Sequence, residues 1–289
     1  MIKIENELLA VSIDLKGAEL QSVYLKQHQL EYLWSGDAAF WGKKSPVLFP
    51  IVGGLKNNQY SFKNKSYSLG RHGFARDKHF ILLAQTTDSA SFLIEADEET
   101  IKVYPFQFRF IVKYHLNNNQ LICTYEVENT GTEEMFFSVG AHPAFKVPLT
   151  TDTKYNDWYL EFEKTENTAI WPLSADGLIE ANSTPYLINT NKLPLKKELF
   201  YGDALVFKNL ASETISIKSD SSTHGLTMQF NDFPFYGIWS AKDADFVCLE
   251  PWCGIADSVN HNSLLIEKEG INVLPPYQFF KRAWGITLF

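Results

Sequence analysis

The sequence predicts an all-β protein, built as one large antiparallel β-sandwich. Two observations lead to this fold class. Apolar and polar residues alternate with a period of two over much of the chain, and helical periodicity is scarce. No long helices separate the strand-like segments, which argues against a parallel sheet with helical crossovers. Aromatic residues make up 15% of the chain, and their flat side chains suit the half-buried face of a strand.

The alternation begins near the start of the chain, where residues 9–15 place Leu, Val, Ile and Leu on one face of a strand. It is clearest over residues 108–116, and it resumes over residues 121–127. Three consecutive asparagines at 117–119 separate these two stretches. Because Asn tolerates the positive φ angles of tight turns, the pattern predicts a β-hairpin.

Shorter alternating or apolar segments predict the remaining strands. They lie at Ser61–Leu69, Phe80–Gln85, Phe92–Glu95, Met135–Gly140, Trp158–Phe162, Leu205–Phe207, Thr214–Lys218, Leu226–Phe230, Gly237–Trp239 and Phe246–Leu249. A helical turn is expected within Leu193–Leu199. No internal repeat and no linker rich in Gly, Ser or Pro divides the chain, so we expect a single domain over residues 1–289.

The composition excludes several classes of function. A net charge of −8 without a basic stripe argues against nucleic-acid binding. The three cysteines, Cys123, Cys248 and Cys253, form no CxxC pair, which argues against a disulfide framework and a structural zinc site. No apolar stretch approaches the length of a membrane-spanning helix, and residues 1–20 do not read as a signal peptide. We therefore expect a cytoplasmic protein without nucleic-acid or membrane partners.

Four short segments interrupt the alternation and place proton-active side chains among apolar neighbours. Each segment also contains a Gly or Pro that ends or bends a strand, which is how a rigid sheet presents a side chain to a cavity. The segments are residues 70–76 with His72, 139–145 with His142, 201–207 with Asp203, and 246–257 with Glu250.

Each of these residues also has a purely structural interpretation. His72 and Asp203 fit ordinary turn chemistry, and His142 before Pro143 can cap a strand end. Glu250 can be a partly buried carboxylate paired with Arg71 or Arg76. Glu250 is nevertheless the most informative of the set, because a carboxylate after the apolar run 246–249 is costly to bury without a partner or a role.

Two other chemistries are poorly supported. The histidines lack the i, i+2 and i, i+4 spacings of common His-based metal motifs, so we expect no metal site. No GxSxG elbow is present, which argues against a hydrolase with a serine nucleophile.

Taken together, the His-Gly-Phe-Ala-Arg, His-Pro-Ala-Phe and Glu-Pro-Trp segments resemble those of the aldose 1-epimerase (galactose mutarotase) family, and of its LacX-like galactose-mutarotase-related branch. The resemblance runs across nearly the whole chain. It also includes residues 17–20, 48–53, 235–239 and 277–284.

The resemblance implies a large β-sandwich of the galactose mutarotase type, with an open cleft for a sugar and no cofactor. It implies that Glu250 is the general base and His142 the general acid. His72 would hydrogen-bond the sugar near its ring oxygen, Asp203 would hold ring hydroxyls, and Arg76 would lie in the cleft.

We expect the carboxylate and an imidazolium to stabilise each other's charges. Two aromatic residues, Trp239 and Phe74, are candidates for stacking on the sugar, although core packing is the commoner role of such side chains.

One position departs from the family pattern. Gly54 stands where family members commonly carry an Arg that reaches the substrate, and Lys56 or Arg71 are the residues that can compensate. The sequence therefore predicts an aldose mutarotase whose partner is a small-molecule sugar, with a neutral sugar favoured. A hexose-6-phosphate mutarotase and a non-catalytic carbohydrate-binding or sensing protein are the alternatives. Both a monomer and a homodimer are compatible with the sequence.

Overall fold

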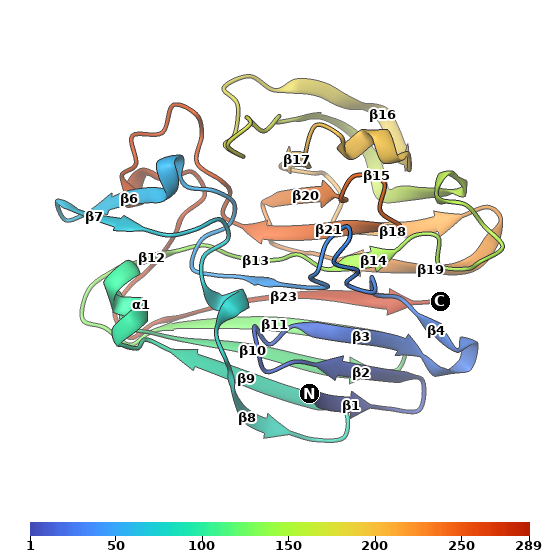
Figure 1. Ribbon diagram of the computed structural model, residues 1–289, viewed down its shortest axis with the longest axis horizontal. Helices are drawn as coiled ribbons and strands as arrows, with labels where there is room; N and C mark the ends of the chain where they lie inside the picture. Colours follow the sequence, from blue (N-terminus) through green and yellow to red (C-terminus); the bar gives the residue numbers. More distant parts are fainter.

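A computed structural model describes residues 1–289, and its main element is a 15-stranded sheet whose neighbouring strands all run antiparallel (Figure 1). In sheet order the strands are β5 (Val47–Leu48), β13 (Val139–Ala141), β21 (Phe246–Cys253), β20 (Phe235–Trp239), β17 (Leu205–Lys208), β15 (Trp158–Ile170), β18 (Thr214–Ser219), β19 (Ser222–Gln229), β23 (Phe279–Leu288), β11 (Gln120–Asn129), β10 (Phe108–Asn117), β9 (Ser89–Glu95) and β8 (Ile81–Gln85), while β14 (Ala144–Lys146) pairs with β21 and β16 (Thr184–Pro194) with β15.

Three smaller sheets complete the fold. They are β1 (Ile2–Glu5) with β2 (Leu9–Ile13), β3 (Leu20–Leu25) and β4 (Leu30–Glu31), the hairpin of β6 (Gln59–Phe62) and β7 (Lys65–Ser68), and the pair β12 (Met135–Phe137) with β22 (Asn272–Leu274). The predicted all-β sandwich is confirmed.

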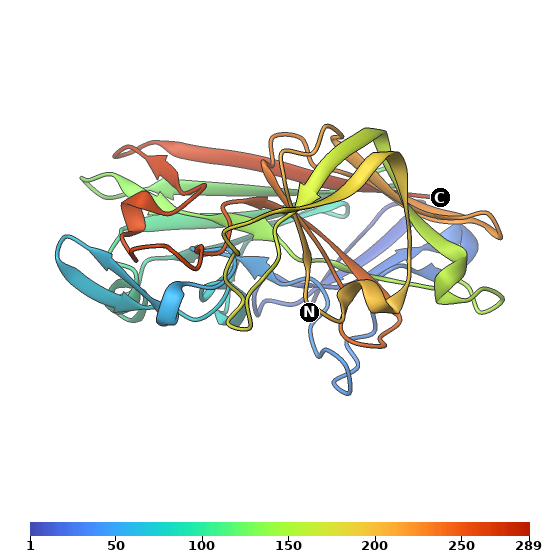
Figure 2. The same cartoon turned by 90° about the horizontal axis from the view of Figure 1, so that it is seen from above.

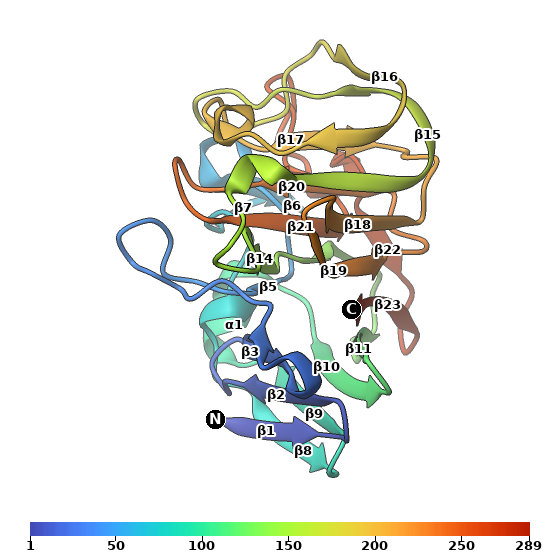
Figure 3. The same ribbon diagram turned by 90° about the vertical axis from the view of Figure 1, so that its right-hand side faces the viewer.

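The sheet of β1–β4 packs against the half of the large sheet that contains β8–β11, and Figures 1 and 3 show these strands as neighbouring layers. Seen from above, the same layers run along the length of the molecule (Figure 2). Tyr114 of β10 crosses the core and donates a hydrogen bond of 2.8 Å to the carbonyl oxygen of Ala18. Every second residue of β10 from Phe108 to Leu116 is buried, because one face of this strand lies between the two layers.

The predicted hairpin of residues 108–127 is confirmed as β10 and β11, with Asn118 at a φ angle of 53° in its turn. The single strand predicted at Ser61–Leu69 is instead the end of β6, a turn and the whole of β7, since Lys63 and Asn64 both adopt positive φ angles between the two strands.

The helical turn within Leu193–Leu199 was placed too early, because β16 continues to Pro194 and the 3₁₀ turn covers Lys197–Phe200. The helix α1 (Glu98–Val103) was not predicted; its N-cap residue Asp97 forms a capping box with Thr100. No helix of the molecule has the length and apolar character that crossing a membrane requires.

Candidate active site

The four polar segments converge on one cavity of about 350 Å³. All six residues predicted for the site line it: Glu250, His142, His72, Asp203, Arg76 and Trp239. A volume of this size suits a small-molecule ligand.

Glu250 lies on the face of β21 that forms the floor of this cavity. Side chains alternate along a strand, so Cys248, Glu250 and Trp252 share this face. Glu250 is paired in register with Gly237 of β20. A β-carbon at Gly237 would lie only 2.4 Å from the Trp252 ring, so the missing side chain leaves room for that ring beside Glu250.

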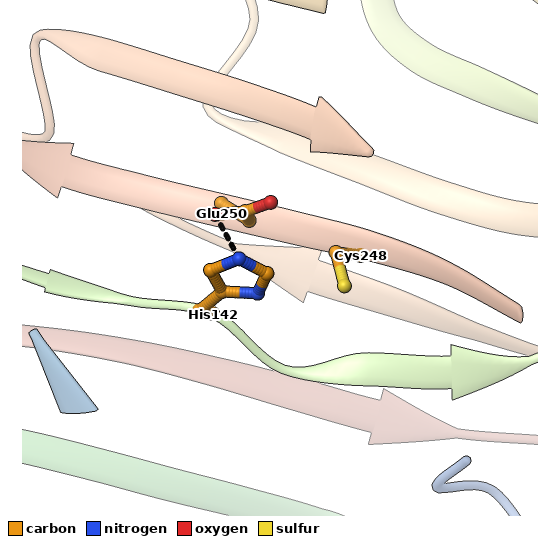
Figure 4. A group of neighbouring side chains, drawn as sticks. All are labelled: His142, Cys248 and Glu250. Carbon is orange, nitrogen blue, oxygen red and sulfur yellow. Dashed lines mark ion pairs between the residues drawn. The ribbon is translucent and has the colours of Figure 1, made fainter. Parts of the chain in front are cut away.

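Strand register also places His142 opposite Glu250. Gly140 of β13 pairs with Trp252, and Ala144 of β14 pairs with Cys248, so the two residues between them face the middle of β21. The Nε2 atom of His142 is 3.3 Å from Oε2 of Glu250, and both side chains are nearly buried (Figure 4). The ring of Trp41 stacks on the imidazole, with the ring centroids 4.9 Å apart.

Burial controls the protonation of this pair. It lowers the pKa of His142 to about 3, and it raises the pKa of Glu250 well above its usual range, which the Asp203 carboxylate reinforces. Both shifts favour the neutral forms, so the proton that the pair shares is held by Glu250. The imidazolium and carboxylate expected from the sequence are therefore not the resting forms of the pair. The depth of burial that opposes both charges is not visible in the sequence.

His72 is fixed by the backbone of residue 53. The backbone N–H of Gly53 donates to Nδ1 of His72 at 3.1 Å, and the N–H of His72 donates to the carbonyl oxygen of Gly53 at 2.9 Å. Since Nδ1 accepts a hydrogen bond, the neutral imidazole carries its proton on Nε2. Burial, with His142 nearby, lowers the pKa of His72 well below its usual value, so the ring stays neutral and its Nε2–H is free to donate to a ligand.

Two arginines, Arg71 and Arg76, line the cavity. The cavity therefore carries more positive charge than was expected from the sequence. An Nη2 atom of Arg71 is 3.8 Å from Oδ2 of Asp203, and Arg76 donates from Nη2 to the Arg71 carbonyl oxygen at 2.9 Å. The guanidinium of Arg71 packs over Gly177, where an added β-carbon would lie 1.6 Å from Nη2.

The structure distinguishes between the two residues that can compensate for Gly54. Lys56 does not line the cavity, and its Nζ donates to the carbonyl oxygens of Val259 and His261. Arg71 lines the cavity, so of these two residues it is the one that can compensate for Gly54.

Three buried polar atoms on the cavity residues have no hydrogen-bond partner within the protein. They are Nε of Arg76, Nδ1 of His142 and Nε1 of Trp252. Buried polar groups are rarely left unpaired, so their concentration here is typical of a site that receives a polar ligand.

The two candidate aromatic residues have different environments. Trp239 lines the cavity, whereas Phe74 packs edge-to-face against Phe49 and Tyr104 in the core. Four further lining residues were not predicted, because they lie in loops without an alternating pattern: Trp41, Leu173, Gly177 and Ile179.

One group of side chains has the composition of a metal site. His142, Cys248 and Glu250 are all buried, and their potential ligand atoms lie within 4.8 Å of one another (Figure 4). The His-based spacing rules did not reveal this group, because the histidine comes from a neighbouring strand segment.

Comparison with known proteins agrees with the fold. Residues 1–275 match the family model described as aldose 1-epimerase. The chain is 35% identical over 297 residues to "Protein LacX, chromosomal" of Lactococcus lactis subsp. lactis, with 99% of each chain covered.

Two solved structures are similar over the full length of the chain. A galactose mutarotase related enzyme from Lactobacillus acidophilus is 36% identical with a TM-score of 0.96, covering 100% of this chain and 97% of that one. A galactose mutarotase-like protein from Lactobacillus casei is 30% identical with a TM-score of 0.94, covering 100% of both chains. The chain belongs to the aldose 1-epimerase family.

Proposed function

We propose that this protein is a mutarotase that interconverts the α and β anomers of an aldose, with Glu250 and His142 as its acid–base pair. The observation that carries the proposal is the contact of 3.3 Å between a buried carboxyl and a buried imidazole at the floor of a sugar-sized cavity. Membership of the aldose 1-epimerase family supports mutarotase chemistry in general.

The chemistry needs two proton transfers. To open the ring, a base removes the proton of the anomeric hydroxyl, a C1=O bond forms, the bond from C1 to the ring oxygen breaks, and an acid protonates that oxygen. Rotation about the C1–C2 bond exposes the other face of the aldehyde, and closure reverses the transfers. Two groups that share one proton are suited to both ring opening and ring closure. Each positioned acid or base typically raises the reaction rate by about 10²–10⁴-fold.

In this proposal Glu250 begins as the base and His142 as the acid. In the sugar-free protein the proton is held by Glu250, but Arg71 lowers the pKa of this carboxyl, and hydrogen bonds from sugar hydroxyls would add to that effect. When the sugar binds, the shared proton would therefore pass from Glu250 to His142, which leaves a carboxylate as the base and an imidazolium as the acid. The neutral His72 would donate from Nε2 toward the ring oxygen, and Asp203 would accept from ring hydroxyls. Trp239 and Arg76 would complete the wall around the sugar.

The second candidate is a mutarotase of phosphorylated aldoses. Arg71 and Arg76 favour it, because two guanidinium groups in one cavity can hold a phosphate. Gly54 and the carboxylate of Asp203 beside Arg71 favour a neutral sugar. Neither candidate requires a cofactor.

The test follows the anomeric conversion of freshly dissolved galactose, glucose and glucose 6-phosphate by polarimetry or proton NMR. We expect acceleration above the buffer rate for at least one sugar, and Glu250→Gln should reduce it by about 10²–10⁴-fold. Glu166→Gln is the matched control, since Glu166 is equally buried but accepts backbone hydrogen bonds from Ala211 and Ser212, and none of these three residues lines the cavity. Binding without acceleration would refute the catalytic proposal and favour a carbohydrate sensor.

A further inference from the structure

We propose that His142, Cys248 and Glu250 form a zinc site that inhibits the enzyme when it is occupied. The inhibition, though not the binding, rests on the function proposed above. The three side chains supply one imidazole nitrogen, one thiol sulfur and one carboxylate, which are the donor types that Zn²⁺ takes in proteins.

Strand pairing holds the three residues in place. Cys248 and Glu250 are two residues apart on β21, so both project from the same face. The backbone pairing of Gly140 with Trp252 and of Ala144 with Cys248 fixes His142 across from them. The ligands therefore need no backbone rearrangement, which is the usual cost of assembling a metal site.

The distances fit zinc after a small side-chain movement. With ordinary zinc–ligand bond lengths, neighbouring ligand atoms of a tetrahedral site lie about 3.3–3.6 Å apart. The Nε2 atom of His142 and Oε2 of Glu250 are already 3.3 Å apart. The sulfur lies within 4.8 Å of the other two ligand atoms, so a tetrahedral site requires it to move slightly closer to them.

The cluster borders the cavity, since His142 and Glu250 both line it. Cys248 is fully buried and, unlike His142 and Glu250, does not line the cavity. The thiol therefore approaches the pair from the protein side, while the cavity leaves a fourth position open to water or a buffer ligand, as zinc sites with three protein ligands do.

Charge balance also favours occupancy. A zinc ion with one thiolate and one carboxylate has no net charge, which limits the cost of burying it. The two cavity arginines oppose a cation, but each has a carboxylate nearby: Asp203 is 3.8 Å from Arg71, and Asp77 is 3.7 Å from Arg76. Binding would occupy both groups of the proposed acid–base pair and so stop proton transfer.

The experiment titrates tag-free protein with Zn²⁺ by calorimetry and with Co²⁺ by absorption spectroscopy. We expect one zinc ion per chain and a sulfur-to-cobalt charge-transfer band. Cys248→Ala should weaken zinc binding at least tenfold and abolish the band. Cys253→Ala should change neither, since the Cys253 sulfur contacts the carbonyl oxygen of Asp232 instead. His224→Ala controls for binding by the His28–His224 pair, whose ring centroids are 4.7 Å apart.

Mutarotation rates with and without Zn²⁺, each relative to the same variant's zinc-free rate, test the inhibition. Zinc should suppress the wild type at least tenfold more strongly than Cys248→Ala. The site is refuted if the wild type binds no zinc, or if Cys248→Ala leaves affinity and spectrum unchanged. Because binding and the cobalt spectrum are measured without substrate, a protein that binds zinc but accelerates no sugar would refute the proposed function and leave the site intact.

Discussion

The buried ion pair of Asp257 and Lys268 supports the wall of the cavity, and its removal should have a large effect. Nζ of Lys268 is 2.7 Å from Oδ1 of Asp257, and their side chains are 1% and 0% exposed. The other carboxylate oxygen accepts the backbone N–H of Lys56 at 2.9 Å, and the backbone N–H of Asp257 donates to Gly54. This pair therefore holds the segment next to Gly53, which in turn fixes His72.

Asp257→Asn removes the negative charge but keeps an oxygen for the Lys56 N–H. It leaves the Lys268 ammonium buried without a counter-charge, and such a change costs about 3–5 kcal/mol. Adding Lys268→Met removes the stranded charge and keeps an apolar side chain of similar length. We therefore expect the double variant to recover most of the free energy of unfolding that Asp257→Asn loses.

The pH dependence gives an independent check. Burial lowers the pKa of Lys268, and Asp257 opposes that shift, so the pKa falls further in Asp257→Asn. Between the folded pKa and the unfolded value of about 10.4, the unfolded chain binds more protons, so stability rises with pH. The difference in the free energy of unfolding between wild type and Asp257→Asn should therefore shrink as the pH is raised toward 10.

The assay is urea unfolding followed by tryptophan fluorescence. Glu269→Gln serves as the control, because its pair with Lys208 is partly exposed and such pairs contribute about 0–1 kcal/mol. If Asp257→Asn lowers the free energy of unfolding by less than about 1 kcal/mol, this account of the pair is wrong. It is also wrong if the effects of the two substitutions on that free energy simply add in the double variant.

Three further predictions concern other parts of the molecule. Gly177→Ala should raise KM more than it lowers kcat in a mutarotation assay, because the added β-carbon overlaps the Arg71 guanidinium; an unchanged KM would contradict a substrate contact by Arg71. Tyr114→Phe should lower the free energy of unfolding by about 1–3 kcal/mol in urea titrations, since it leaves the buried Ala18 carbonyl unpaired, whereas an unchanged midpoint would argue against that bond. Asp97→Ala should lower the free energy of unfolding by about 0.5–2 kcal/mol, because it removes the N-cap of α1. The bond from Lys78 helps lower the pKa of Asp97 to about 2, so the difference from wild type in thermal unfolding should persist above about pH 4 and disappear as the pH falls through 2.

Local patterns were sufficient to predict much of the fold. The hairpin of β10 and β11 could be located because alternation and three turn-forming asparagines act within about twenty residues. The turn at Lys63 and Asn64 was missed because a single asparagine beside a lysine is a weaker turn signal than the three asparagines at 117–119.

The candidate site was predicted by its motifs, but its electrostatics were not. The four polar segments could be found because a carboxylate or imidazole is conspicuous among apolar residues. Trp41 was missed because its position depends on stacking against His142, about a hundred residues away in the chain. The neutral state of the Glu250–His142 pair depends on how deeply the finished fold buries it.

The position of β23 has a consequence for how the molecule assembles. This strand lies between β19 and β11 in the large sheet, so residues 279–288 join two groups of strands that otherwise do not pair. Each group can form by pairing strands that are closer in the sequence. Joining the two groups requires β23 to pair with β11, from which it is separated by more than 150 residues, and contacts between such distant residues form slowly. Until β23 docks, β11 and β19 both expose unpaired backbone, and such open edges invite pairing with other chains. Aggregation during refolding should therefore start at the middle of the finished sheet rather than at its rim.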